Sequence, residues 1–456
     1  MKYDIAIIGA GPGGYAAAIR AAQLGAKVVL TEKDEVGGTC LNRGCIPSKA
    51  VIASADRFND AKNLSKFGIN AENLSYDYGV VFDRKEKIVK KLVRGLSQLI
   101  KANKIDLLKG EACIESEHSL MIGDARIEFD NLILATGSET TSLPNIKLDH
   151  KFILDTDDIL MLEELPKSVM IIGSGASGIE WARIFNNFEK QAILVEIEPT
   201  LCPMTDTSVS SAIERFFKKR KIEFYTGVSV EKIEDKKVTL SNGKEFAPEI
   251  VFLAVGRKPN ANIKGLDVEL NGKYIKVDEN LRTNIANIYA IGDVTGICQV
   301  AHAASHQGIK AVEHILLGQD VDIDYKNVPF VMYGHPEIAS VGYSENQLIE
   351  MNKPYKKSIF PMAALGKSEV EAETDGFVKI LANDEEILGA HVVSAGGAEL
   401  IHQLAIAKSA GVSPEKLKEV IFAHPTYSEA VFEASLGLFE QALHLPPGIK
   451  LSYYNR

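Results

Sequence analysis

The chain has 456 residues, 46% of them hydrophobic and 25% charged, with a net charge of −10, and this length predicts about three domains in a soluble enzyme of ordinary composition. The acidic balance argues against a nucleic-acid partner, and no apolar run approaches the roughly 18 residues that a membrane span requires. Five cysteines are too few for a secreted disulfide framework and the first strand begins almost at once, so we expect a cytoplasmic protein, or a mitochondrial matrix protein that has lost a presequence.

The first predicted unit, in residues 3–33, is a buried strand, a glycine-rich turn, an alanine-rich helix and a second strand. The turn contains Gly9, Gly11 and Gly14. These glycines permit a tight turn, let a pyrophosphate approach the backbone and let the helix pack closely on the strand, while the helix N-terminus offers free N–H groups to phosphates. Glu32 ends the second strand, where a carboxylate accepts hydrogen bonds from ribose hydroxyls. The order of these parts predicts a dinucleotide site; the alternative is a glycine-rich turn with no ligand.

The next segment, GGTCLNRGCIPSKA at residues 37–50, contains two of the five cysteines, Cys40 and Cys45. A zinc clip would need closer spacing and further ligands, and a structural disulfide is unusual in a reducing compartment. A reversible disulfide remains. Pro47 is typical of a first helical turn, so Cys45 lies near a helix N-terminus, close to Arg43 and Lys49. Such an environment lowers a thiol pKa from its free value of about 8.5, and we predict a redox-active pair.

A second strand, glycine turn, helix and strand occupies residues 168–199. Its glycines are Gly173, Gly175 and Gly178. The following strand ends at Glu196, and Glu198 comes two residues later. A 2′-phosphate would need a cation here, so these carboxylates favour NAD over NADP. Two such units in one chain predict a tightly held flavin dinucleotide, FAD, and a mobile nicotinamide dinucleotide, NAD.

The redox segment resembles that of the dihydrolipoamide dehydrogenase family, within the flavin disulfide reductases, and the resemblance covers essentially the whole chain. Besides GGTCLNRGCIPSK, the matching motifs are LILATGS (132–138), LAVGRKPN (253–260), YAIGDV (289–294), AHAASHQGI (301–309), VPFVMYGHPEIASVG (328–342) and FAHPTYSEA (422–430).

The resemblance assigns roles to residues around the flavin. Asp293 is implied to bond the ribityl or pyrophosphate portion, and the helix that starts near Ala301 to face the isoalloxazine ring. Lys49 matches the lysine near flavin N5, and Glu180 matches the carboxylate that pairs with it. The remaining cofactor-binding assignments are Thr136, Gly137 and Gly256.

The resemblance also implies an acid–base pair near the C-terminus. His424 matches a histidine that reaches the disulfide of the other subunit, and Glu429 matches the carboxylate that orients it. The bond between His424 and Pro425 is expected to be cis. A histidine titrates in the working range of thiol chemistry, and a carboxylate on its second nitrogen fixes the tautomer. We predict no metal site.

The expected fold is α/β, with two Rossmann-like dinucleotide-binding domains and a C-terminal α+β dimerisation domain. The FAD domain is assigned to residues 1–147 and 278–322, the NAD domain to residues 148–277, and the interface domain to residues 327–456. A histidine donated by the other subunit implies an obligate homodimer.

The implied reaction is oxidation of protein-bound dihydrolipoamide by NAD. The implied partners are the lipoyl domains of a 2-oxo acid dehydrogenase acyltransferase or the glycine cleavage H protein. The second candidate is a glutathione- or mercuric-type reductase. The glutathione type requires basic residues where this chain has Glu198, and the mercuric type carries a C-terminal cysteine pair, whereas no cysteine follows Cys298 in this sequence. A flavin NADH oxidase or peroxidase would need a single redox cysteine. A different class of alternative is an assembly component with a vestigial flavin, which the intact set of cysteines, histidine and glutamate disfavours.

Overall fold

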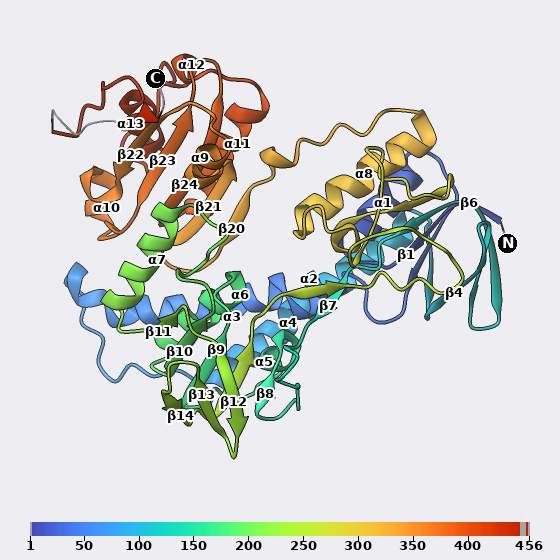
Figure 1. The fold of residues 1–456 in the computed structure, drawn as a ribbon, viewed down its shortest axis with the longest axis horizontal. Helices are drawn as coiled ribbons and strands as arrows, with labels where there is room; N and C mark the ends of the chain where they lie inside the picture. The colour runs from blue at the N-terminus through green and yellow to red at the C-terminus, as the bar shows by residue number, and fades with distance from the viewer. Residues whose placement is uncertain (1, 447–452, 455–456) are drawn as a thin grey trace.

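The computed structural model describes residues 2–446 and the backbone of residues 453–454. Three large sheets organise the chain (Figure 1), the first on the right of that view, the second below and the third at the upper left. The first sheet has seven strands, in the order β3-β2-β1-β6-β5-β4 with β19 on β6. Its strands are β1 (Lys2–Ile8), β2 (Val28–Glu32), β3 (Asp106–Lys109), β4 (Ala112–Ser116), β5 (Ser119–Ile122), β6 (Ala125–Leu134) and β19 (Ile288–Ala290).

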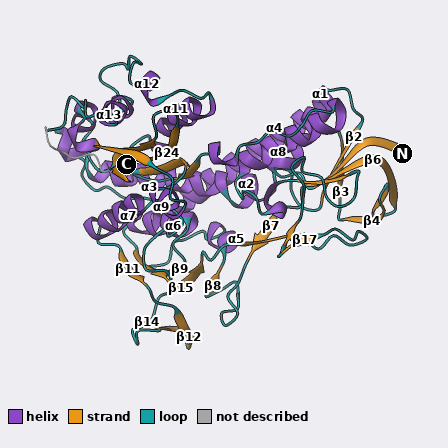
Figure 2. Ribbon diagram, turned by 45° about the horizontal axis from the view of Figure 1, so that its top comes forward, coloured by secondary structure: helices purple, strands orange, loops and turns teal. Residues whose placement is uncertain are grey.

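The helices on one face of the first sheet share a core with β1 (Figure 2). These are α1 (Pro12–Gln23), α4 (Tyr78–Ala102) and α8 (Ala301–Leu317). Ile5 and Ile7 of β1 are fully buried against Ala17 and Ala21 of α1, and the small alanines let this helix lie close to the strands. The redox segment forms two further helices, α2 (Gly38–Arg43) and α3 (Cys45–Lys62).

The second sheet is wholly parallel, in the order β11-β10-β9-β15-β8. Its strands are β8 (Ile153–Leu154), β9 (Ser168–Ile172), β10 (Gln191–Glu196), β11 (Glu223–Thr226) and β15 (Ile250–Leu253), and its helices are α5 (Thr156–Leu160), α6 (Ala176–Asn187) and α7 (Thr207–Lys219). Antiparallel additions to this part of the chain are β12 (Val230–Glu234), β13 (Lys237–Leu240) and β14 (Glu245–Phe246), with a further pair of β17 (Leu270–Asn271) and β18 (Tyr274–Ile275). The chain leaves the first sheet through β7 (Ser138–Thr140) and returns through β16 (Arg257–Pro259), and these two strands pair with each other.

The third sheet is antiparallel, in the order β20-β21-β24-β23-β22-β25. Its strands are β20 (Phe330–Met332), β21 (Glu337–Gly342), β22 (Tyr355–Pro361), β23 (Phe377–Ala382), β24 (Ile387–Ser394) and β25 (Tyr453–Tyr454), with helices α9 (Glu345–Glu350), α10 (Gly366–Val370), α11 (Gly397–Ser409), α12 (Pro414–Leu417) and α13 (Glu429–Gly437). The predicted α/β fold, with two Rossmann-like units and a C-terminal α+β unit, is confirmed; the first sheet is mixed, because β4, β5 and β6 pair antiparallel at one side of it. The domain boundaries stay a prediction.

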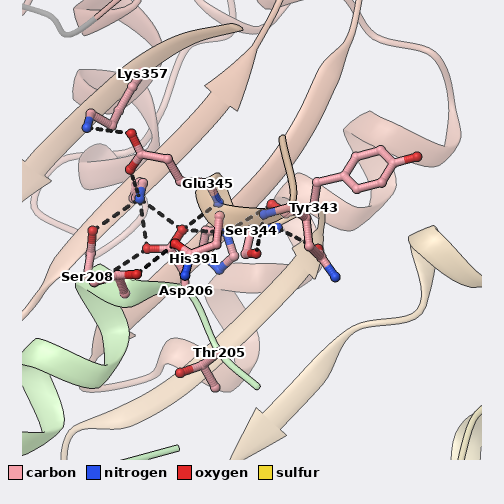
Figure 3. Close-up of polar contacts among 12 residues, drawn as sticks. Thr205, Asp206, Ser208, Tyr343, Ser344, Glu345, Lys357 and His391 are labelled. Carbon is pink, nitrogen blue, oxygen red and sulfur yellow. Dashed lines mark hydrogen bonds and ion pairs between the residues drawn. The ribbon is translucent and has the colours of Figure 1, made fainter. Parts of the chain in front are cut away.

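A buried ionic cluster joins the second and third sheets (Figure 3). Lys379 on β23 places its Nζ 2.7 and 2.9 Å from the carboxylate oxygens of Asp206, the N-cap residue of α7. The same Nζ lies 2.6 Å from Glu345 Oε2 at the start of α9. Neither Lys379 nor Asp206 has any exposed side-chain surface. Because each charge is paired inside the protein, the cluster fixes α7 against the third sheet.

Within the described residues, no helix combines the length and the apolar character needed to cross a membrane.

Candidate active site

One large cavity, of about 1890 Å³, brings most of the predicted site residues together. Both glycine turns, the cysteine pair and the start of the third sheet line its wall. The predicted residues among those lining it are Gly9, Gly11, Glu32, Cys40, Cys45, Lys49, Thr136, Gly137, Gly175, Glu180, Gly256, Asp293 and Ala301.

In the first glycine turn, neighbouring backbone atoms lie so close to Gly9 and Gly14 that neither position can hold a side chain. Gly9 has φ +102°, and a Cβ there would lie 2.3 Å from Ala135 O. A Cβ on Gly14 would lie 1.8 Å from Gly9 O, so this glycine serves the packing of α1 and does not line the cavity. Glu32 Oε2 accepts a hydrogen bond from Ala10 N at 2.8 Å, which holds the turn to β2. The N-terminus of α1 therefore faces the cavity on a rigid turn, as a phosphate site requires.

The second glycine turn repeats this construction. Gly173 has φ +100° with a Cβ position 2.5 Å from Ala254 O, and the Cβ position of Gly178 is 2.0 Å from Gly173 O. The carboxylate of Glu196 accepts hydrogen bonds from Ser174, at 2.8 Å from the backbone N and 2.5 Å from Oγ. Gly173, Gly178 and Glu196 support the turn from behind the cavity wall; a ribose contact by Glu196 stays a prediction.

The two cysteines meet at the junction of α2 and α3, and both are free thiols in the structure. Cys45, the first residue of α3, has its pKa lowered to about 7, chiefly by a hydrogen bond from Cys40 and further by the charge of Lys49, against the opposing effect of burial. The same hydrogen bond and burial raise the pKa of Cys40. Cys45 is therefore the cysteine of the pair that loses its proton first, while Cys40 keeps its proton more strongly. This agrees with the predicted activation of Cys45.

The predicted contribution of Arg43 to that activation stays a prediction. Its guanidinium forms an ion pair with Asp34 and lies 3.2 Å from Asp157 on α5. These carboxylates offset its positive charge, and Arg43 is not among the main causes of the lowered pKa of Cys45. Arg43 is close to Cys45 in sequence, but its guanidinium is paired with Asp34 and Asp157.

Lys49 and Glu180 form the predicted pair across the cavity. Lys49 Nζ donates to both carboxylate oxygens, at 2.9 Å to Oε2 and 3.1 Å to Oε1. Glu180 lies on α6 and is 4% exposed, whereas Lys49 is 32% exposed and opens onto the cavity. The lysine is thus held by a buried carboxylate while one side of its ammonium remains available near Cys45.

Asp293 lies in a hydrogen-bonded chain that motif reading alone did not find. Ser138 Oγ donates to Asp293 Oδ2 at 2.5 Å, and Arg257 donates to Ser138 Oγ and O, each at 2.7 Å. Both Ser138 and Arg257 line the cavity. Ser138 belongs to the motif LILATGS and Arg257 to the motif LAVGRKPN. The family resemblance marked these motifs but assigned no role to either residue.

His424 and Glu429 also pair as predicted, but away from the cavity. The His424 ring donates through Nδ1 to Glu429 Oε1 at 2.8 Å, and the bond to Pro425 is cis. Burial would raise the pKa of Glu429, but the Thr426 N–H and the His424 ring outweigh it and lower that pKa. The His424 side chain is 77% exposed and is not among the cavity-lining residues. Within one chain, the structure does not bring it to the cysteines.

Comparison with known families gives two matches that follow one another along the chain. Residues 3–308 match the family described as pyridine nucleotide-disulphide oxidoreductase. Residues 328–435 match its dimerisation domain. The second match supports a homodimer.

Several curated proteins are similar over nearly their whole length. A dihydrolipoyl dehydrogenase of Bacillus subtilis is 37% identical over 97% of this chain and 99% of its own length. One of Chlamydia muridarum is 38% identical over 98% of each chain.

Solved structures are also similar to this chain over most of its length. The HOCl-induced flavoprotein disulfide reductase RclA from Escherichia coli superposes with a TM-score of 0.85 and 27% identity, covering 95% of this chain and 99% of that one. LpdA from Mycobacterium tuberculosis, at 23% identity with a TM-score of 0.88 and coverage of 95% and 99%, shares the fold.

Proposed function

The chain belongs to the pyridine nucleotide-disulphide oxidoreductase family, and we propose that it is a dihydrolipoyl dehydrogenase that oxidises protein-bound dihydrolipoamide with NAD. The observation that carries this proposal is the Cys45 thiolate, paired with Cys40 and beside Lys49, in a cavity bounded by two dinucleotide-type turns. The nearly full-length similarity to proteins named dihydrolipoyl dehydrogenase supports the choice of substrate.

The first turn fits FAD. No side chain fits at Gly9, the α1 N-terminus faces the cavity, and Asp293 has one carboxylate oxygen engaged by Ser138, which leaves the other for a ligand hydroxyl. The second turn fits NAD, because Glu196 and Glu198 would repel a 2′-phosphate. When bound, the flavin accepts two electrons from a dithiol and returns them to the nicotinamide as hydride.

The protein side of the reaction is thiol–disulfide exchange. His424 of a second copy of the chain takes the proton of the first substrate thiol, and the resulting thiolate attacks Cys40 of the Cys40–Cys45 disulfide. The bond between the two cysteines breaks, and Cys45 leaves as a thiolate stabilised by Lys49. The second substrate sulfur then attacks the mixed disulfide, its proton passes to Cys40 as Cys40 is expelled, and the cyclic disulfide is released. The substrate loses two electrons and the cysteine pair gains them.

The pKa shifts of the two free cysteines fit the state after this exchange, because the lowered pKa of Cys45 favours its thiolate and the raised pKa of Cys40 favours its thiol. Glu429 holds the Nδ1 proton of His424, so that Nε2 is the atom that exchanges protons with the substrate. We further propose that the partners are lipoyl domains of a 2-oxo acid dehydrogenase acyltransferase or the glycine cleavage H protein. A cytoplasmic location stays a prediction from composition.

The proposal is tested by steady-state assays of the purified holoenzyme. We expect reduction of NAD by dihydrolipoamide, at least 100-fold slower reduction of NADP, and NADH-dependent turnover of lipoamide but not of glutathione disulfide. Exclusive turnover of glutathione disulfide would contradict the proposed function.

A further inference from the structure

Tyr333 is a cavity-lining residue to which the reaction above gives no role. It directly follows β20, so it belongs to the third sheet and not to either dinucleotide unit. Its ring lies over the ammonium of Lys49, with Nζ 4.8 Å from the ring centroid. A cation over an aromatic face at this distance is attracted by the ring quadrupole. The structure therefore places an aromatic face from the C-terminal unit on the lysine of the redox helix.

The backbone of Tyr333 is tied to the same ion pair. Its N–H donates to Glu180 Oε1 at 3.0 Å, and this oxygen also accepts from Lys49 Nζ at 3.1 Å. One buried carboxylate on α6 thus fixes both the lysine and the residue whose ring covers it. The ammonium is bounded by the carboxylate on one side and the ring on another.

The segment that carries Tyr333 is also held at a second point of α6. Arg183, one turn beyond Glu180, donates to Pro336 O at 2.9 Å and lies with its guanidinium 4.9 Å from the ring centroid of Phe216. Gly334 has φ +125°, and a Cβ there would lie 2.3 Å from Arg183 Nη1. Because Arg183 is buried between these contacts, it leaves room only for glycine beside Tyr333. The position of the ring is thus set by the fold.

We propose that Tyr333 is a positioning residue that holds the Lys49 ammonium against Glu180 and beside Cys45, so that the aromatic ring stabilises the Cys45 thiolate through the lysine. This inference rests on the proposed function. A lysine has a flexible four-carbon stem, and without the ring Lys49 gains freedom to turn away from Cys45 into the cavity. The ring performs this role and the hydroxyl does not, since no hydrogen bond to the hydroxyl is found among the described residues.

Other charged or titratable groups also act on Cys45. The groups that face it in the chain are Cys40 from α2, Lys49 from α3, Glu180 from α6, Tyr15 from α1 and Tyr333 itself. Both tyrosines can be changed to Phe with the ring retained, but among the described residues the ring over the Lys49 ammonium is that of Tyr333.

The test is an anaerobic pH titration of the holoenzyme reduced by one equivalent of dithiol, followed through the long-wavelength charge-transfer absorbance of the Cys45 thiolate. We expect Tyr333→Phe to titrate as wild type. We expect Tyr333→Leu and Tyr333→Met to raise the apparent pKa by about half a unit, which is about a threefold change in the ratio of thiolate to thiol at a given pH. Met fills a similar volume with a flexible chain, so it keeps the test informative where Leu disturbs folding.

An unchanged titration in both Tyr333→Leu and Tyr333→Met, beside a normal wild-type band, overturns the role of Tyr333 and leaves the proposed function intact. A wild-type holoenzyme that gives no band overturns the proposed function and, with it, this inference. An equal shift in Tyr333→Phe also overturns the inference, because it would assign the effect to the hydroxyl.

Discussion

Two lysine–carboxylate pairs in this molecule have the same chemistry and opposite surroundings. Lys379 and Asp206 have no exposed surface and join two sheets (Figure 3). Lys49 and Glu180 also come from different elements, yet Lys49 is 32% exposed and faces the cavity. In the first pair every donor of the lysine is used by protein oxygens, from Asp206, Glu345 and Ser208. In the second, Lys49 donates only to Glu180 among the described residues, and its ammonium also lies over the Tyr333 ring.

The difference separates a pair that maintains the fold from one that acts on a neighbouring atom. A closed pair, such as Lys379 and Asp206, has no exposed atoms with which to contact a ligand. Removing one partner leaves the other charge buried and unpaired, which strongly lowers the free energy of unfolding. An open pair can lose its lysine at modest cost to stability, because Glu180 still accepts from the Tyr333 N–H, while the charge beside Cys45 disappears. Stability and turnover should therefore respond separately to changes in the two lysines.

The largest expected effect is on stability, in Lys379→Met. Removing the cation leaves Asp206 buried without its partner and should lower the free energy of unfolding by about 3–5 kcal/mol, measured by chemical denaturation. Turnover per folded molecule should not change. Lys357→Met is the matched control, since Lys357 contacts only the rim of the same cluster through Glu345; its loss should be about 1 kcal/mol or less. Equal losses in the two variants would remove the distinction between a closed cluster and its rim.

The second effect is on turnover, in Lys49→Met. Loss of the charge that stabilises Cys45 as a leaving thiolate should lower kcat by about 100-fold. The loss of unfolding free energy should be about 1–2 kcal/mol, smaller than in Lys379→Met, because Glu180 borders the cavity and keeps the Tyr333 N–H. Steady-state NAD reduction and chemical denaturation on the same preparation measure both. A variant that unfolds as readily as Lys379→Met, but turns over normally when folded, would show that the two pairs do not differ as we describe.

The third effect is a pH dependence of stability that arises from the closed cluster. Burial lowers the pKa of His391, so the folded protein binds its proton less readily than the unfolded chain, whose histidine titrates near 6.5. Its contribution is therefore present above pH 6.5 and is lost as pH falls below that value, at up to about 1.4 kcal/mol per pH unit. The pKa of Asp206 is also lowered, since His391 and Lys379 outweigh its burial, and this extends the loss below pH 3.8.

Substitution of His391 isolates its share of this dependence. His391→Gln should flatten the unfolding free energy between pH 6.5 and 5, measured by urea denaturation at each pH. An unchanged slope in that variant would assign the dependence to other groups.

The smallest effect is expected for Arg43→Met, which removes a third kind of ionic contact. Arg43, Asp34 and Asp157 are each roughly two-fifths exposed, and exposed pairs of this kind are worth about 0.2–1 kcal/mol. Thermal unfolding should change little, and the Cys45 titration should match wild type, because the guanidinium is paired with Asp34 and Asp157 and Arg43 is not among the main causes of the lowered pKa of Cys45. A raised Cys45 pKa in this variant would restore the role that sequence proximity first suggested.

Sequence patterns predicted what depends on short stretches of chain. The glycine turns follow from the strand–turn–helix order, and β10 ends at Glu196 as the pattern indicates. Lys49 and Glu180 are far apart in sequence, so their pairing was available only from a family resemblance. The position of Tyr333 over Lys49 depends on how the third sheet packs on α6, which no local pattern encodes, and the orientation of Arg43 depends on two carboxylates from other elements.

The central claim, that Cys45 is a thiolate that exchanges electrons with a flavin beside it, is tested most directly by reducing the purified yellow protein anaerobically with dithiothreitol and recording its absorbance. A long-wavelength charge-transfer band should appear in the wild-type protein and be absent from Cys45→Ser, while Cys40→Ser should show it without added dithiol. A wild-type protein that is reduced without any such band, or a band that persists in Cys45→Ser, would contradict the account.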